Sequence, residues 1–449
     1  MSGLSHSWQG PEPRSFLHGI HPAGHKEYSH KLAIERMPFV GELVLHLSQH
    51  IGAPARPIVA VGDRVERGQR VADPGGFVSV GLHAPATGTI KAIEKRLHPN
   101  GKLLDAIVLE TDPFASQRLL AAAPFDPAAV TASEMVERMQ LGGLVGLGGA
   151  AFPSHVKASV PKGKEVKAVV INGVECEPFL TCDHRLMVER PQDVIRGTRI
   201  LMQSVGADRG YIGVEINKPD AIEALAAAAS DGVVVQPLKV KYPQGAEKQL
   251  IKAIFGDEVP EGGLPLDLEL VVNNVGTMAA LADLVDRGAP LIERVVTVTG
   301  PAIKQPKNLL VPLGTPISAV IERCGGLTPS VKQVILGGPM TGMAQKSLDV
   351  PVVKGTSGIV CLDSVEVATR EEYPCIRCGR CVEACPLFLN PARLAQIVKY
   401  EKVDLFEDYH LMTCFECSSC SFVCPSAIPL VQYMRMGKAM LRKHKAHKR

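Results

Sequence analysis

Eight of the twelve cysteines stand in two matching runs near the C-terminus, and this duplication constrains the chain more than any other feature. Each run reads C-x2-C-x2-C-x3-C-P. Three thiolates at this spacing let one tight loop hold three corners of a cubane, while the fourth cysteine reaches the other cubane. The runs therefore predict two [4Fe–4S] clusters. Their predicted ligands are Cys375, Cys378, Cys381 and Cys424 for one cluster and Cys414, Cys417, Cys420 and Cys385 for the other.

Zinc ribbons and disulfides are the alternative uses of such cysteines. A zinc site needs four ligands and has no use for the duplicated triple spacing or the trailing proline. Disulfides are rare in a reducing cytosol, and the polar stretch 1–13 lacks the apolar core of a signal peptide. We therefore expect a cytoplasmic chain with reduced thiols. Leu394, Ile397 and Val398, between the two runs, have helical spacing and predict a mostly helical cluster domain.

Composition and charge indicate the class of protein. The 449 residues are enough for several domains, and 46% hydrophobic with 21% charged residues is ordinary for a soluble globular protein. No apolar stretch approaches the roughly 18–20 residues that cross a bilayer. A net charge of +3 gives no reason to expect nucleic-acid binding. Residues 435–449 hold several Lys and Arg and no acid, which indicates either a solvated, frayed tail or attraction to an anionic membrane or an acidic partner.

Signals for β-strands dominate residues 36–120. Apolar runs such as 58–61 alternate with Gly and Asp at turns, which predicts a small β barrel or sandwich. The region resembles the barrel-sandwich hybrid domains of biotinyl and lipoyl carriers. Such carriers present a modifiable lysine at a hairpin tip, and no lysine stands between Val71 and His83 here. We therefore expect a structural docking module.

Strands and helices alternate along residues 130–290. Residues 166–171 and 211–215 have the composition of strands, whereas residues 190–205 and 221–229 have helical apolar spacing. This order predicts an α/β layer structure. The region that follows resembles a soluble-ligand-binding β-grasp domain. The chain is thus predicted to be multidomain, α/β and α+β, with an N-terminal segment 1–35, domains 36–120, 130–290, 291–360 and 370–435, and a basic tail 436–449.

A glycine-rich loop spans residues 146–157 and ends in Lys157. Glycines this dense let backbone N–H groups approach an anion closely, and the lysine adds a point charge for phosphate. Three further polar segments follow it along the chain, at residues 172–178, 242–247 and 273–277. Alone, the loop is weak evidence for a phosphate site, because glycine-rich loops are often only loops.

The four segments, in this order, resemble the NADH-binding flavoprotein subunit of respiratory complex I. The resemblance implies FMN and NADH sites and needs no catalytic nucleophile or general base. It implies that FMN is held by Gly148, Gly149, Lys157, Asn172, Asn273, Asn274 and Thr277. It implies a nicotinamide and ribose side at Glu175, Glu177 and Glu247, and an adenine contact at Phe152. Tyr242 would either stack near the nucleotide or pack at a strand end.

Over nearly its full length the chain resembles the RnfC family, the C subunits of the Rnf ion-translocating electron transport complex. The matching stretches are 19–22, 146–157, 172–178, 183–187, 350–354 and 424–433, with both cluster motifs in place. The resemblance implies a peripheral module at the cytoplasmic face of the inner membrane. Such a module would exchange electrons with NADH through FMN and pass them through two [4Fe–4S] clusters toward other Rnf subunits and, indirectly, ferredoxin or flavodoxin.

Two alternatives stay open at this point. A soluble flavin and iron–sulfur cobalamin reductase of a bacterial microcompartment shares this domain order. A non-catalytic electron relay with a degenerate flavin pocket would also carry the clusters. Val174 and Ala246, which replace acidic residues of the complex I subunit, favour the relay.

Overall fold

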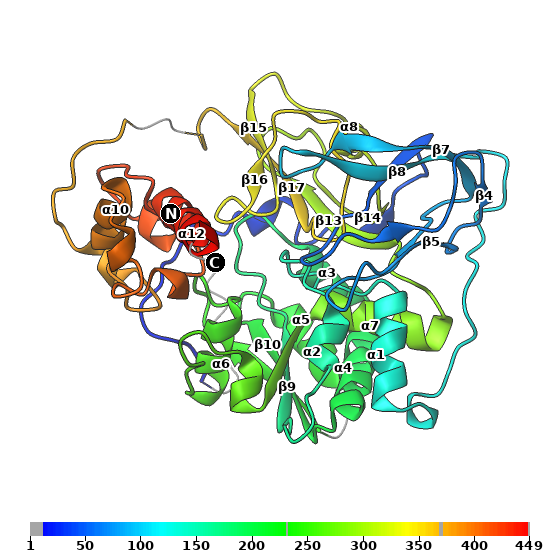
Figure 1. Cartoon of the computed structure of the whole chain (residues 1–449), viewed down its shortest axis with the longest axis horizontal. Coiled ribbons are helices and arrows are strands. Elements are labelled where there is room, and N and C mark those ends of the chain that lie inside the picture. Colours follow the sequence, from blue (N-terminus) through cyan, green and yellow to red (C-terminus); the bar gives the residue numbers. More distant parts are fainter. Residues whose placement is uncertain (1–11, 230–231, 368–370, 448–449) are drawn as a thin grey trace.

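A four-stranded parallel sheet forms the centre of the middle domain, in the order β11–β10–β9–β12 (Figure 1). The computed structural model describes residues 12–229, 232–367 and 371–447. The predicted N-terminal segment and basic tail include residues 1–11 and 448–449, which lie outside that part. The strands of the parallel sheet are β9 (Ala168–Asn172), β10 (Arg209–Glu215), β11 (Val233–Leu238) and β12 (Leu270–Asn274).

Strand β9 is buried on both faces of this sheet, as its run of β-branched residues predicts. Because side chains alternate along a strand, Val169 and Ile171 pack in one core while Ala168 and Val170 pack in another. Helix α6 (Glu247–Phe255) covers the second core. The helices whose residues build the first core are α1 (Ala132–Leu141), α2 (Ser154–Ala158), α3 (Cys182–Glu189), α4 (Pro191–Val205), α5 (Pro219–Ala228) and α7 (Val275–Arg287).

A glycine lets helices α4 and α7 pack closely. A methyl group placed on Gly197 would lie 1.9 Å from the main-chain oxygen of Met278, which cannot move away without distorting α7. We therefore expect Gly197→Ala to destabilise the protein by about 3 kcal/mol, although alanine alone favours helices by about 1 kcal/mol. Urea unfolding measures the difference. Gly41→Ala is the control, since no described atom lies within 4 Å of the group added there. Equal stability of the two variants would contradict this account of the packing.

The β domain near the N-terminus consists of two small sheets, ordered β2–β8–β7–β4 and β3–β5–β6. The predicted strand at 58–61 is wrong. The main-chain N–H of Ala60 donates to the Asp63 side chain, and Gly62 has a positive φ of 93°, so the segment turns and leaves Val61 61% exposed. The strands are β2 (Glu42–His46), β3 (Arg56–Pro57), β4 (Arg64–Val65), β5 (Arg70–Asp73), β6 (Leu82–His83), β7 (Gly88–Leu97) and β8 (Leu103–Thr111).

A six-stranded mixed sheet follows the middle domain, in the order β1–β14–β13–β17–β15–β16. It extends beyond the predicted boundaries 291–360 at both ends. Strand β1 comes from the N-terminal segment and pairs with the free edge of β14, and such a short strand leaves no sequence signal. The elements are β1 (Ile34–Arg36), β13 (Glu293–Thr299), β14 (Lys307–Pro312), α8 (Ile317–Arg323), β15 (Val331–Leu336), β16 (Met343–Ala344) and β17 (Gly358–Asp363).

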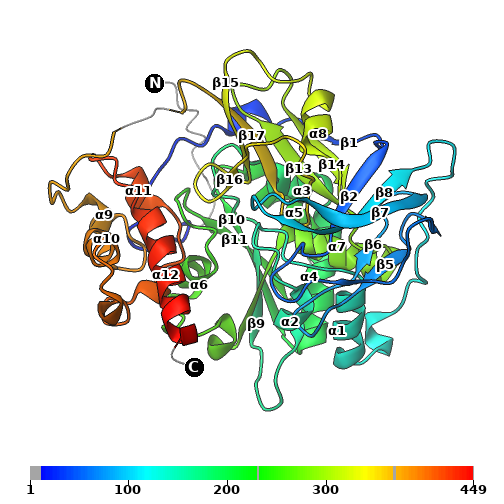
Figure 2. The same ribbon diagram turned by 45° about the horizontal axis from the view of Figure 1, so that its top comes forward.

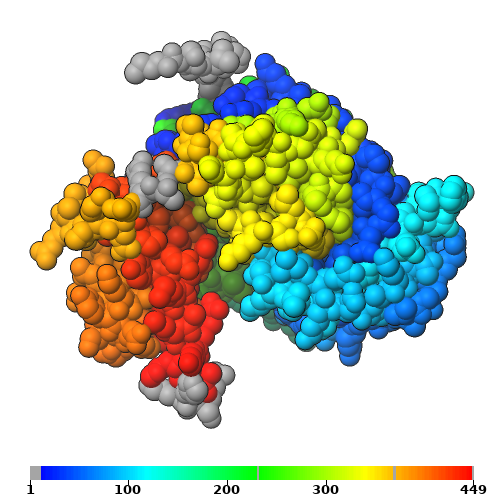
Figure 3. Space-filling view, turned by 90° about the horizontal axis from the view of Figure 1, so that it is seen from above, coloured from blue at the N-terminus to red at the C-terminus, as the bar shows by residue number. Residues whose placement is uncertain are grey.

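The C-terminal lobe is helical, and Figure 2 shows its long last helix, α12, lying along it. In the space-filling view of Figure 3 this lobe, orange and red, lies beside the rest of the molecule. The described part of the basic tail is helical rather than frayed, because α12 buries Lys438 and Leu441. Residues 442–446 are exposed, as a solvated tail predicts. The helices are α9 (Arg380–Glu383), α10 (Pro391–Lys399), α11 (Ser419–Phe422) and α12 (Leu430–His447). No described helix combines the length and apolar character needed to cross a bilayer.

Candidate functional site

A cavity of about 720 Å³, here called the central cavity, opens where β9 and β12 end. Parallel sheets bind ligands at the carboxyl ends of their strands, and Asn172 and Asn274 stand at those ends. All parts of the molecule contribute to its wall. The β domain supplies residues 48–51 and 98–100, the mixed sheet supplies residues 336–338, and the cluster lobe supplies Phe415 and Cys417.

Seven of the predicted cofactor residues line the central cavity. They are Gly148, Gly149, Asn172, Glu175, Glu177, Tyr242 and Asn274. Gly149 has a positive φ of 110°, a backbone conformation that favours glycine. No described atom lies within 4 Å of the position that a side chain would occupy there, so the backbone of this turn is open to a ligand. The Asn172 amide donates to Gly245 O (2.7 Å), and the Asn274 amide donates to Asp183 (2.7 Å). The site is therefore built from exposed backbone and from fixed amides, and its volume suits a ligand the size of FMN.

The other five predicted residues lie outside the lining of the central cavity. They are Phe152, Lys157, Glu247, Asn273 and Thr277. The Lys157 ammonium donates to Glu247 (2.7 Å) and to Val272 O (2.9 Å). The Thr277 hydroxyl accepts from Leu147 N and donates to Val145 O. Asn273 is buried, and neither amide atom of its side chain has a hydrogen-bond partner among the described residues. Their predicted cofactor roles stay predictions.

Glu175 and Glu177 hold neighbouring segments in place. Glu175 accepts from the main-chain N–H groups of Asp183 (2.8 Å) and His184 (3.2 Å), and so caps the first turn of α3. Glu177 accepts from Met340 N (3.1 Å) and from the Thr341 hydroxyl. Burial raises the pKa of the Glu177 carboxyl. Both carboxylates thus shape the cavity wall, Glu177 by fixing the loop that leads from β15 to β16.

A half-buried lysine, Lys26, and a buried one, Lys218, support the loop 173–180, and the sequence analysis missed both. Lys26, from the N-terminal segment, donates to the main-chain oxygens of Glu175 (2.8 Å), Glu177 (2.8 Å) and Leu180. Lys218 donates to Val174 O (2.7 Å) and forms a buried ion pair with Glu215. Both lysines are distant from the loop in sequence. The one sequence signal that could have pointed to Lys26 is its position shortly after residues 19–22, a stretch that matches the RnfC family.

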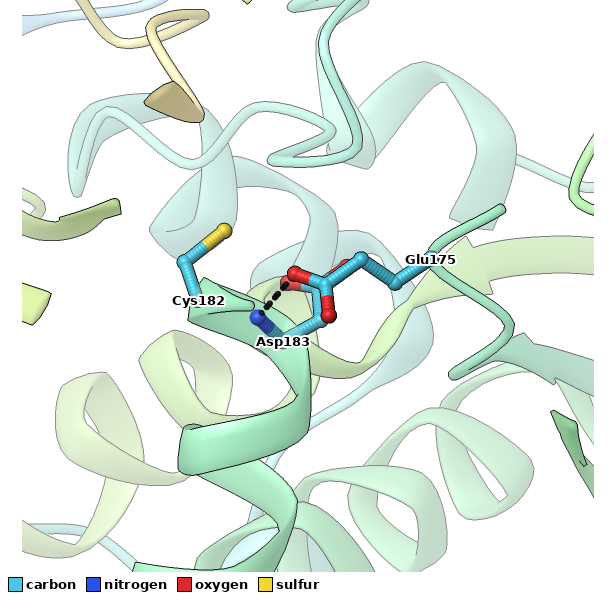
Figure 4. A group of neighbouring side chains, drawn as sticks. All are labelled: Glu175, Cys182 and Asp183. Atoms are coloured by element: carbon cyan, nitrogen blue, oxygen red, sulfur yellow. Dashed lines mark hydrogen bonds between the residues drawn. The ribbon is translucent and has the colours of Figure 1, made fainter. Parts of the chain in front are cut away.

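Asp183 lies at the back wall of the central cavity, beside Glu175 and Cys182 (Figure 4). The ligand atoms of these three side chains lie within 4.8 Å of one another. Burial, and next the charge of Glu175, raise the pKa of the Asp183 carboxyl to about 7. Arg294 and Lys218 oppose this rise, and so does the hydrogen bond from Asn274. Burial and the neighbouring carboxylate therefore favour the protonated form of Asp183 far more than that of an exposed carboxyl group.

The eight cluster cysteines form two groups, which match the predicted ligand sets. Cys385, Cys414, Cys417 and Cys420 line one small cavity in the C-terminal lobe. Cys381 lies near Cys424, Cys375 and Cys378, and burial, together with the negative charges of their thiolates, raises the pKa of the Cys381 thiol. Thiolates are the ligands that [4Fe–4S] clusters take, and each group offers four. The residues present therefore fit two such clusters.

The first group is next to the central cavity, and the second reaches the surface. Cys417 lines both the central cavity and the cluster cavity. Tyr242 donates from its hydroxyl to Cys417 O (2.8 Å), which ties the middle domain to the cluster lobe. Tyr242 thus packs between the middle domain and the cluster lobe, a contact that was not predicted, and its stacking near the nucleotide stays a prediction. Cys375 and Cys378 are exposed.

Family models cover most of the chain. The RnfC barrel sandwich hybrid domain matches residues 14–113, and the Nuo51 FMN-binding domain matches residues 139–283. An SLBB domain matches residues 295–344, and a 4Fe-4S dicluster domain matches residues 372–428. The predicted fold class, FMN and the pair of [4Fe–4S] clusters are thereby confirmed. A solved NAD+-reducing [NiFe]-hydrogenase in the air-oxidized state also matches, at 20% identity and a TM-score of 0.48, over 70% of this chain and 63% of that chain.

Curated relatives match nearly the whole chain, and the three described next are each the C subunit of an ion-translocating complex. The relative from the Na(+)-translocating ferredoxin:NAD(+) oxidoreductase complex of Acetobacterium woodii is 44% identical over 89% of this chain and 90% of that protein. Its proton-translocating counterpart from Clostridium ljungdahlii is 43% identical over 95% and 94%. The relative from the ion-translocating oxidoreductase complex of Rhodobacter capsulatus is 39% identical over 96% and 84%. This chain belongs to the RnfC family, the C subunits of ion-translocating oxidoreductase complexes.

Proposed function

We propose that this chain exchanges electrons with NADH at the central cavity and conducts them through its two clusters toward membrane subunits of an Rnf complex. One observation carries the proposal. Cys417 belongs at once to the wall of the central cavity and to the inner group of cluster cysteines, whereas the outer group is exposed at Cys375 and Cys378. The cofactor sites therefore form a line from the cavity to the surface.

FMN, when bound, would accept a hydride from a nicotinamide and release the two electrons one at a time. A [4Fe–4S] cluster accepts only single electrons, so the flavin is needed between the nicotinamide and the clusters. The chain's own residues hold and align the reactants. The glycine turn at Gly148 and Gly149 offers backbone N–H groups, and the amides of Asn172 and Asn274 keep the strand ends in place. Lys26 and Lys218 fix the loop 173–180, which forms part of the cavity wall that would hold the cofactor.

An apolar cluster joins the wall of the central cavity to the inner group of cysteines. Its core is Ile20, Tyr242 and Ala384, and Cys176, Met340, Cys417 and Val423 pack against it. Such a cluster excludes water from the path of the electrons and strengthens the electrostatic interactions within it. It supports direct transfer from the cavity to the inner cluster.

The partners follow from the relatives. The relatives from Acetobacterium and Clostridium are named as subunits of ferredoxin:NAD+ oxidoreductase complexes that translocate sodium ions or protons. We assign this chain the same place, attached to membrane subunits at the cytoplasmic face, with ferredoxin or flavodoxin served indirectly. The exposed basic side chains of α12, Arg442 and Lys443, would be attracted to an anionic membrane or an acidic partner.

The test is a reduction experiment on anaerobically purified protein. Flavin and iron content are measured first, and NADH is then added while flavin absorbance and cluster EPR signals are followed. We expect bound FMN, about eight irons per chain, bleaching of the flavin and reduction of the clusters. FMN that ignores NADH would contradict the proposal and support the electron relay.

A further inference from the structure

Two further cavities continue behind the central cavity. The first, here called the inner passage, has a volume of about 90 Å³ and shares Leu147, Cys182 and Asp183 with the central cavity. The second, here called the arginine cleft, has a volume of about 460 Å³ and is lined by Arg36, Arg67, Arg190 and Arg287. The inner passage and the arginine cleft share Arg190, Asp283 and Glu293. The three cavities therefore adjoin one another in series, with the shared side chains standing between them.

The inner passage can hold water. A cavity needs roughly 10–15 Å³ to hold one water molecule, and each water needs two to four polar partners. The passage is several times larger, and Asp183, Arg190, Asp283, Glu293 and Arg294 line it. A short chain of waters would thus find hydrogen-bond partners along the whole passage, from the cavity wall to the cleft.

Among the described residues, Asp183 is the carboxyl group that lines both the central cavity and the inner passage. The charged and polar groups that face it are Glu175 from the loop after β9, Arg294 from β13, Lys218 from the turn after β10, Asn274 at the start of α7 and its neighbour Cys182. Glu175 is engaged by two main-chain N–H groups of α3, so Asp183 is the freer carboxyl of the two.

Burial also shifts the pKa values of other titratable groups on the cavity wall, and none of these groups lines the inner passage except Cys182. Burial lowers the pKa of His50 to about 4 and lowers that of His98 as well. Burial raises the pKa values of Cys176, Cys182 and Tyr242 far above neutral. Glu177 is held by Met340 and Thr341. The position of Asp183 between the two cavities therefore singles it out among the described carboxyl groups.

The reaction at the cavity must dispose of a proton. Oxidation of NADH yields NAD+, one proton and two electrons, and the electrons leave through the clusters. We propose that Asp183 takes up this proton and releases it through the waters of the inner passage to solvent in the arginine cleft. In the reverse direction the same residues supply the proton. This inference rests on the proposed function and adds a route that is separate from the path of the electrons.

The first test is an infrared titration of the flavin-free full-length chain, followed in the stretching band of protonated carboxyl groups. We expect a band that titrates near neutral pH, is lost in Asp183→Asn and is kept in Asp286→Asn, whose side chain pairs with Arg196 at the surface. Absence of such a band, or its survival in Asp183→Asn, would overturn the proposal. This readout needs no NADH, so it is independent of the proposed function.

The second test is stopped-flow kinetics of the loaded protein. In Asp183→Asn, reoxidation of the flavin through the clusters should slow by about tenfold relative to the rate at which NADH bleaches the flavin in the same variant. Ala280→Leu, which fills the inner passage, should slow reoxidation similarly without touching Asp183. If Asp183→Asn fails to retain flavin, Ala280→Leu decides. Unchanged reoxidation in Ala280→Leu would overturn the route, whereas a chain that ignores NADH altogether would refute the proposed function instead.

Discussion

A Cys417→Ser chain is expected to accept hydride from NADH and yet leave its outer cluster oxidised. Loss of this ligand removes the cluster that the inner group would hold, so the iron content should fall from about eight to about four per chain. Cys417 joins the central cavity to the cluster lobe, and no other cluster cysteine, all eight being described, lines that cavity. Electrons delivered by NADH would therefore stay on the flavin. EPR spectra recorded after NADH addition measure the outer cluster directly.

Cys378→Ser is the matched comparison, because it removes a ligand of the exposed outer group. It should lower the iron content equally while NADH still reduces the inner cluster. The two variants thus differ in which cluster remains and in whether NADH reaches it. If NADH instead reduced the remaining cluster in Cys417→Ser but not the one in Cys378→Ser, the outer cluster would be the one that accepts electrons from the flavin first.

Lys26→Met should destabilise the protein by roughly 3 kcal/mol and weaken flavin retention. The change leaves the main-chain oxygens of Glu175, Glu177 and Leu180 without their donor, and each unsatisfied buried group costs about 1–3 kcal/mol. Burial of the ammonium opposes this, since it lowers the pKa of Lys26. Three hydrogen bonds to a charged donor outweigh that cost. Urea unfolding and flavin content after gel filtration measure the two effects.

Lys31→Met serves as the control for Lys26→Met, because Lys31 is exposed and lies in the same N-terminal segment. Its stability and flavin content should match those of the unmodified chain. Equal flavin retention in both variants would show that the loop 173–180 keeps its shape without Lys26, and would remove that residue from the support of the site.

The cluster ligands and the glycine turn were predictable because their chemistry is local in sequence. Eight thiols at fixed spacing suit two cubanes, and dense glycines suit an anion, whatever surrounds them. The same local logic failed at 58–61, where the Asp63 side chain and Gly62 turn an apolar run into an exposed loop. It failed again at the basic tail, where contact with the cluster lobe orders α12.

The sequence by itself determined the cofactors of this protein, because metal and phosphate ligands are specified by residue type and short spacing. Only the tertiary structure decided which group of cluster cysteines adjoins the central cavity and which lysines support its wall. It also decided that Asp183 lies between the central cavity and the inner passage. Several of those relations join residues more than a hundred positions apart, such as Lys26 with Glu175 and Tyr242 with Cys417. Burial then sets their charge and hydrogen bonding, and burial exists only once the domains have packed.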